Sequence, residues 1–314
     1  IVDPVVPPEI PLGIYHLLGK KRDDAVATIA FYNFESRQRQ FRVIVEIPGL
    51  TNRQSNSITV PIAQVKGVPY KVRVTPPLKL DFDIAKIRST RAASVSLTIE
   101  EELAGNVKRP LYRETINVNL LPRDHLPTRR LVGRDHVKET LEYIAAWVMP
   151  NEPSIDPFLR EAKQRHPTKA FAGMQAPTVP QVKALYDALK ARGVTYVMDP
   201  FMFSSQYTVQ RTRLPAEVLK TTNAQCLEGT ILFASLMEAI GLSAIIVTVP
   251  GHAFVGWRLS PGDKAAGINA EVLFLETTMV GVAPFAAAVK VATKRVADER
   301  KKGTFKYGVS RLLP

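Results

Sequence analysis

The chain has 314 residues, of which 46% are hydrophobic and 23% are charged, and this balance excludes extensive disorder and predicts a folded protein of two domains. No apolar run is long enough to span a bilayer, so we expect no transmembrane segment. The formal net charge of +13 favours acidic partner surfaces, but Lys and Arg are scattered without a dense basic block, so no specific nucleic-acid binding is expected.

The first part of the chain carries short β-type runs separated by turn residues: AVATIAFYNF, QFRVIVEIPG, NSITVPIAQ, YKVRVTPPL, ASVSLTIEEE and YRETINVNLLP. Apolar and polar residues alternate from Tyr70 to Val74, which is the period of a half-buried strand. These runs predict an antiparallel β-sandwich. The charged stretch LLPRDHLPTRRLVGRD ends the pattern and is the predicted linker. We therefore expect a β-sandwich domain over 1–127 and a second domain over 128–314.

The hydrophobic period then changes from strand-like to helical. Apolar residues recur at helical spacing in DHVKETLEYIAAWVM (135–149) and in VPQVKALYDALKARG (179–193), where a Gly ends the pattern. Strand-like runs return after residue 241. The predicted class is therefore α+β, with helices and strands mixed in the second domain.

The only cysteine, Cys226, opens a long apolar segment with helical spacing. Thr222 or Asn223 is the expected N-cap, and Gly241 is the expected stop. In the first turn of a helix, free N–H groups and the helix dipole lower a thiol pKa and can stabilise an oxyanion. The alternative is that Cys226 only packs in the core, as isolated cysteines often do. A single cysteine excludes an intrachain disulfide but leaves the compartment open.

Three strands are expected after this helix: LSAIIVTV, HAFVGWRL beginning at His252, and AEVLFLE ending at Glu276. If the last two form a hairpin, the start of one lies beside the end of the other, and His252 and Glu276 become neighbours. Cys226 as nucleophile, His252 as base and Glu276 as the acid that orients the imidazole would make a thiol triad.

The segments QCLEGTILFASLMEAIGLSAIIVTVPGHAFVGW and FLETT resemble the transglutaminase-like, papain-related superfamily, and PNEPSIDPFLREA and VQRTRLPAEVL resemble a bacterial transglutaminase-like domain. The likeness covers about 130–280. It implies a Cys, a His and an acid on a helix, a strand and the next strand. Many relatives carry Asp where this chain has Glu228 and Glu276, so the longer carboxylates depart from the family pattern.

Three further residues are candidates for the site. Gln210 and Gln225 are side-chain amides that can donate to an oxyanion, and Trp257 can shape a substrate groove, although an aromatic residue on a strand usually belongs to the core. Glu228 is interpreted as a capping or salt-bridge residue. The other histidines show no metal spacing, and no phosphate loop or dinucleotide fingerprint appears, so we expect neither metal nor cofactor.

The sequence thus predicts acyl transfer from a peptide-type amide of a protein or peptide substrate, with water (protease or amidase) or an amine (transglutaminase) as the acceptor. Two alternatives stay open: a noncatalytic docking module that keeps the same fold, and nucleic-acid binding, which rests on charge alone. The opening IVDPVVPPEIPLG has neither a basic start nor an apolar signal core, so the localisation stays unknown and we expect a leader or upstream region to have been removed.

Overall fold

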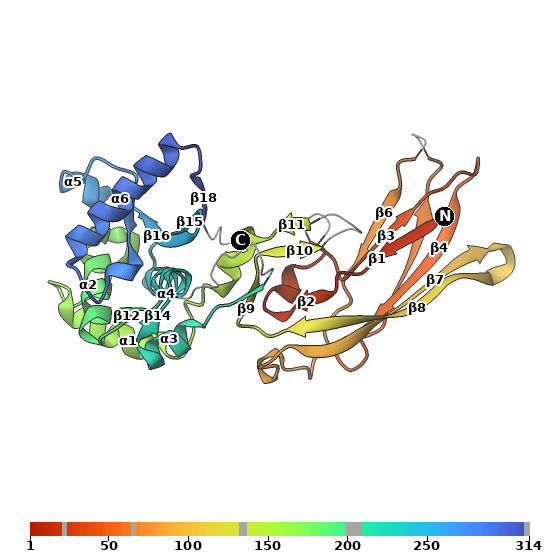
Figure 1. Cartoon of the computed structure of the whole chain (residues 1–314), viewed down its shortest axis with the longest axis horizontal. Coiled ribbons are helices and arrows are strands. Elements are labelled where there is room, and N and C mark those ends of the chain that lie inside the picture. The colour runs from red at the N-terminus through yellow and green to blue at the C-terminus, as the bar shows by residue number, and fades with distance from the viewer. Residues whose placement is uncertain (21–23, 64–66, 132–136, 199–208, 311–314) are drawn as a thin grey trace. The chain divides into compact units, whose positions relative to one another are not determined.

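A computed structural model describes residues 1–20, 24–63, 67–131, 137–198 and 209–310, with 306–310 described for the backbone only. The chain mixes helices with several sheets, as the α+β prediction requires, and it divides into two compact units, Ile1–Thr140 and Leu141–Pro314 (Figure 1). Within the described ranges, no helix is both long enough and apolar enough to cross a membrane.

The N-terminal unit is built from strands. Their bounds are β1 Val2–Val5, β2 Glu9–Pro11, β3 Ala27–Phe31, β4 Arg39–Glu46, β5 Gln54–Val60, β6 Tyr70–Val74, β7 Arg91–Leu103, β8 Val107–Leu121, β9 His125–Pro127, β10 Arg129–Leu131 and β11 Val137–Glu139. One sheet has the order β1-β3-β6, a second has the order β2-β8-β7-β4-β5, and β10 pairs with β11. Only the β2–β8 pair among these is parallel.

Alternating side chains explain these sheets. Val95, Leu97 and Ile99 of β7 are fully buried, with less buried residues between them, as expected for a sheet with one face on the core. The rings of Phe31 and Phe41, one from each large sheet, lie 4.8 Å apart. Each β-type run predicted from the sequence overlaps one of the strands β3 to β8. Strands β1 and β2 were not predicted, because the prolines at the start of the chain weaken the strand pattern there.

The boundary between the units lies later than the predicted one, between Thr140 and Leu141 rather than after residue 127. The reason is a set of polar contacts to Asp24, which is fully buried. Lys138 donates to both carboxylate oxygens of Asp24 at 3.0 and 2.8 Å, and Arg130 donates to the Asp24 carbonyl at 3.0 Å. These bonds hold the β10–β11 hairpin in the N-terminal unit. Part of the predicted linker, 132–136, lies outside the described residues.

The C-terminal unit begins with a 3₁₀ helix at Leu141–Trp147. Its helices are α1 Ile155–Ala162, α2 Thr178–Ala191, α3 Pro215–Thr221, α4 Cys226–Ala239, α5 Pro261–Ala265 and α6 Phe285–Lys301. Its strands are β12 Thr195–Tyr196, β13 Val209–Arg211, β14 Asn223–Ala224, β15 Ala244–Val249, β16 His252–Arg258, β17 Val272–Leu275 and β18 Lys306–Ser310. An antiparallel sheet has the order β17-β16-β15-β18, and β12 pairs with β14 in parallel.

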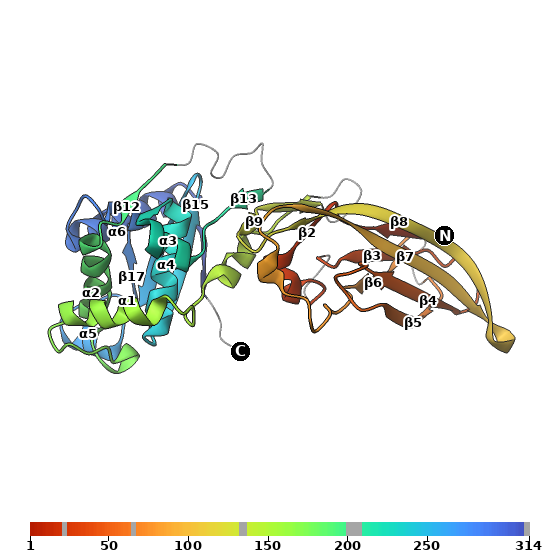
Figure 2. The ribbon, with the colours of Figure 1, turned by 90° about the horizontal axis from the view of Figure 1, so that it is seen from below.

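Helix α4 is the central helix of this unit and packs on β15 and β16 (Figure 2). Residues 226–237 are all buried, which is the behaviour of a helix that is apolar on every side. Helix α6 packs on β17, and its Ala292 and Val296 join Val247 and Phe254 in one hydrophobic cluster. Helix α4 itself is held against the sheet by its packing on β15 and β16.

One predicted helix is wrong. Of the stretch 135–149, the first two residues lie outside the described residues, Val137–Glu139 is strand β11, and Leu141–Trp147 is a 3₁₀ helix. Pairing of β11 with β10 and a hydrogen bond from Thr140 Oγ1 to the Pro127 carbonyl impose an extended chain there. Tertiary contacts therefore override the helical spacing. The helix predicted over 179–193 is confirmed as α2.

Candidate active site

Cys226 is the first residue of α4, in the helical turn where the sequence predicts it. The N-cap is Gln225 rather than Thr222 or Asn223, because Gln225 and Glu228 form a capping box. The Gln225 side chain accepts from the backbone N–H of Glu228, and Glu228 Oε2 accepts from the Gln225 N–H at 2.9 Å. Thr222 instead ends α3 in the left-handed region, with φ 54°.

Glu228 has the capping and salt-bridge role predicted for it. Its carboxylate is almost fully buried and forms a two-pronged pair with Arg213, with Nε to Oε1 at 3.0 Å and Nη2 to Oε2 at 2.7 Å. The Arg213 backbone N–H also donates to Oε1 at 2.9 Å. With both oxygens engaged in this way, Glu228 secures the start of α4 and is not available as a triad acid.

His252 and Glu276 are neighbours, as the predicted hairpin requires. His252 opens β16 directly after a tight turn in which Gly251 has φ 71°, and it lies opposite Val249. Strand β17 pairs antiparallel with β16 and ends one residue before Glu276. His252 Nε2 lies 2.8 Å from Glu276 Oε2. The side chains are 15% and 3% exposed respectively, so the contact is largely shielded from water.

The Glu276 contact determines which imidazole nitrogen can act as a base. A carboxylate only accepts, so His252 Nε2 carries a hydrogen, and in the neutral imidazole it is Nδ1 that has the lone pair. Glu276 Oε1 also accepts from Thr278 Oγ1 at 2.8 Å and from the Thr278 N–H at 3.3 Å. Burial works to raise the Glu276 pKa, but the bonds from His252 and Thr278 outweigh it and hold the pKa below its ordinary value. Glu276 is therefore ionised at neutral pH.

The thiol of Cys226 lies beside this pair but is not activated at rest. Burial raises the pKa of Cys226 to about 12, although a hydrogen bond from the Ala253 N–H to the sulfur works in the opposite direction. The charge of Glu276 raises the pKa further, and the helix-start N–H groups of Cys226 and Leu227 lower it. The prediction of a lowered pKa is therefore wrong for this conformation, because the cost of desolvating a thiolate exceeds what the amides supply.

The Ala253 contact nevertheless locates the sulfur. Ala253 is the residue after His252, so its N–H places the Cys226 sulfur next to the peptide that opens β16. The structure thus brings together Cys226, His252 and Glu276 from α4, from β16 and from the end of β17.

The remaining predicted site residues divide into two groups. Gln210 is 7% exposed, and its Nε2 donates to Gln225 Oε1 at 3.1 Å, so the two amides lie together at the start of α4. Trp257 is completely buried, its Nε1 donates to Thr178 Oγ1 at 2.9 Å, and its ring packs against Phe285. The prediction that Trp257 shapes a substrate groove is therefore wrong, because its indole belongs to the core.

Sequence reasoning missed one residue near the thiol, Tyr196. It lies on β12 opposite Ala224 of β14, which precedes Cys226 by two positions. Burial raises the Tyr196 pKa, and the Glu276 carboxylate and the Cys226 thiolate, once formed, raise it further, so the phenol lies within electrostatic reach of both groups. A two-residue strand leaves no periodic signal, so no sequence pattern linked Tyr196 to this site.

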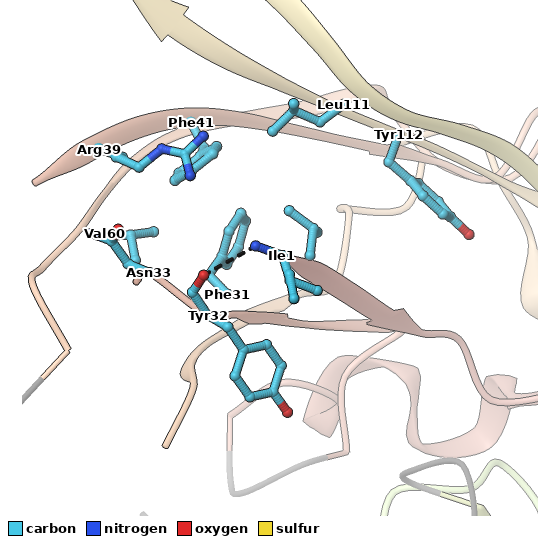
Figure 3. Close-up of a pocket in the computed structure, with 10 residues that line it drawn as sticks. Ile1, Phe31, Tyr32, Asn33, Arg39, Phe41, Val60, Leu111 and Tyr112 are labelled. Carbon is cyan, nitrogen blue, oxygen red and sulfur yellow. Dashed lines mark hydrogen bonds between the residues drawn. The ribbon is translucent and has the colours of Figure 1, made fainter. Parts of the chain in front are cut away.

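A separate pocket of about 240 Å³ lies in the N-terminal unit. Figure 3 shows the rings of Phe31, Phe41 and Tyr112 around it, with the Arg39 guanidinium beside Phe41. Arg39 also pairs with the buried Glu101, with Nε to Oε1 at 2.8 Å. The aromatic walls suit an apolar group, but the lining residues include no thiol or imidazole, so this pocket offers no acyl-transfer chemistry.

Comparisons of this chain with protein-family models, with curated proteins and with solved structures found no match. Among the described residues, no group of His, Cys, Asp or Glu side chains is arranged to hold a metal ion.

Proposed function

We propose that the chain catalyses thiol-dependent acyl transfer or hydrolysis on peptide-type amides, with Cys226 as nucleophile, His252 as base and Glu276 as the group that orients and charges His252. The observation that carries this proposal is the hydrogen bond of 2.8 Å between His252 Nε2 and Glu276 Oε2, made beside the only thiol of the chain. A buried carboxylate on one imidazole nitrogen leaves the other nitrogen free to take a proton.

In the proposed first step, the Cys226 sulfur attacks the substrate carbonyl carbon while His252 Nδ1 takes the thiol proton. A C–S bond forms, and the carbonyl π electrons move to the oxygen. The proposed donors to that oxyanion are the backbone N–H groups of Cys226 and Leu227 at the start of α4. The side-chain amides of Gln210 and Gln225 are further candidate donors. Because the resting thiol is neutral, proton transfer accompanies the attack, and the Glu276 carboxylate stabilises the imidazolium that forms.

Collapse of the tetrahedral intermediate reforms the C=O bond and breaks the C–N bond, and the leaving amine takes the proton from His252. The resulting thioester is then attacked by water or by a second amine, whose proton passes to His252. Breaking the C–S bond releases acid or new amide, and the proton returns from His252 to the sulfur of Cys226. Water as acceptor makes the protein a protease or amidase, and an amine makes it a transglutaminase.

The proposal extends to the fold. The contact between Phe31 and Phe41 supports a β-sandwich in the N-terminal unit. The order of Cys226 on a helix, His252 on a strand and Glu276 after the next strand supports a transglutaminase-like C-terminal unit, which the sequence resemblance also implies.

A noncatalytic docking module is the second candidate, and one observation favours it. Cys226 is fully buried and its pKa is raised to about 12, which is the behaviour of a packing residue as well as of a resting nucleophile. The two candidates differ in whether any acyl group is ever transferred to the sulfur.

A peptide screen tests the proposal. Glutamine- and lysine-containing peptides are incubated with the protein and analysed by mass, because cleavage, deamidation and cross-linking change the mass differently. We expect one of these products with the wild type and with His166→Ala, a control imidazole that bonds Thr168 away from the site. Cys226→Ala and His252→Ala should lose it. No product, together with no acylation of Cys226 by an activated ester, would establish the docking module instead.

A further inference from the structure

An exposed apolar surface adjoins the proposed active site. Its members are Tyr196, Val197 and Met198 at the end of β12 and Val282 after the 3₁₀ turn that follows Glu276, with exposed fractions of 39%, 46%, 74% and 82%. We call these four residues the apolar rim. Apolar side chains gathered at the surface next to reactive groups are typical of a binding site.

Backbone pairing fixes one side of the rim to the nucleophile. Strand β12 runs parallel to β14, with Tyr196 opposite Ala224, and the Val197 N–H donates to the Ala224 carbonyl at 3.0 Å (Figure 1). The chain then enters α4 at Cys226. The end of β12 is therefore held close to the first turn of α4 by two short strands rather than by a loose loop.

Close packing fixes the other side of the rim to the triad acid. A Cβ added to Gly281 would lie 3.1 Å from Thr195 Cγ2 and 3.2 Å from the Val194 carbonyl, so the segment after Glu276 lies directly against β12. The Tyr186 hydroxyl holds that segment by donating to the Met279 carbonyl at 2.8 Å, with the Ala283 carbonyl at 3.0 Å. Val282 is thus brought next to the strand that carries Tyr196.

Tyr196 is the member of the rim nearest the chemistry. It lies opposite Ala224, two residues before Cys226, and the Glu276 carboxylate acts on its phenol, so the rim begins beside the reacting groups and continues along the chain through Val197 and Met198. A molecule whose carbonyl sits at the Cys226 sulfur would place its adjoining residue on this surface. The occupant is therefore the acyl substrate itself.

We propose that the apolar rim binds a large apolar side chain beside the reacting carbonyl, so that the preferred acyl donor is a peptide with a residue such as Leu or Phe next to the acyl group. This inference rests on the proposed function and specifies its substrate class. A charged or small polar side chain in the same place would lose hydration without gaining an apolar contact.

The test uses two glutamine peptides that differ at one position, Leu or Ser beside the acyl residue. Their affinity is measured by fluorescence anisotropy on the full chain carrying Cys226→Ala, which binds without turnover. We expect the Leu peptide to bind about tenfold tighter, the range for one apolar side chain in a pocket. Adding Met198→Ser or Val282→Ser should remove most of that preference.

Leu80→Ser is the matched control, because Leu80 is a fully exposed apolar residue of the N-terminal unit. It should leave the preference unchanged. Equal affinity for both peptides, or equal loss of preference in Leu80→Ser and Met198→Ser, overturns the inference. Because binding is measured without turnover, these results are separate from the peptide screen: products without an apolar preference refute only the rim, and a preference without products refutes only the catalysis.

Discussion

The resting state of Cys226 leads to a quantitative prediction about alkylation. A thiol with the ordinary pKa of about 8.5 is roughly one-quarter thiolate at pH 8. With the pKa raised to about 12, the thiolate fraction of Cys226 at pH 8 is on the order of 10⁻⁴. Only the thiolate reacts with iodoacetamide, so alkylation of the folded protein should be slower than that of the unfolded chain by roughly a thousandfold.

The measurement is the alkylation rate from pH 7 to pH 11, followed by intact mass, with the chain unfolded in guanidinium as the reference. The folded protein should show no inflection near pH 8.5. His252→Ala should change the rate little, because a neutral thiol forms no ion pair with the imidazole. An inflection at or below pH 8.5 that disappears in His252→Ala would refute the reasoning, since it would reveal a thiolate–imidazolium pair.

The same shift makes the fold sensitive to alkali. Because the pKa of Cys226 is raised in the folded protein, its thiol keeps the proton at pH values at which the thiol of the unfolded chain is already ionised. The stabilising contribution is fully present below the unfolded pKa and is lost as the pH rises towards 12, by at most about 1.4 kcal/mol per pH unit. Urea titrations at pH 8 and pH 10 should show a smaller alkaline loss in Cys226→Ser than in the wild type.

Glu276→Gln removes the charge that stabilises protonated His252, so turnover in the peptide screen should fall by roughly 10²–10⁴-fold, and a near-normal rate would contradict the acid assignment. Because the Glu276 pKa is held low, its stabilising contribution is present above the ordinary value of 4.5 and lost as the pH falls below it, so urea titrations at pH 7 and pH 3 should show a smaller acid loss in the variant. Lys138→Met deprives buried Asp24 of its ammonium partner and should lower the free energy of unfolding by roughly 3–5 kcal/mol. Lys294→Met, in an exposed pair, should hardly change it, and equal effects would contradict the buried-pair argument.

Much of the site was predictable because the signals that build it are local. The helix α4 with Cys226 in its first turn, and its end before Gly241, follow from apolar spacing and a helix stop within one segment of the chain, although its N-cap is Gln225 and not the predicted Thr222 or Asn223. The neighbourhood of His252 and Glu276 follows from two strand patterns separated by turn residues, because an antiparallel hairpin joins the start of one strand to the end of the next.

Only the tertiary structure decided the properties that depend on what surrounds a residue. The raised pKa of Cys226 comes from burial, and residue type and helix position alone favoured the opposite direction. Trp257 is a core residue because its indole meets Thr178 from a distant helix. The domain boundary moved because Lys138 reaches Asp24, 114 positions away along the chain, and Tyr196 reached the site through strand pairing. Local sequence specifies the helices and strands. The burial of a side chain, and its contacts with residues far away along the chain, arise only once those elements have packed.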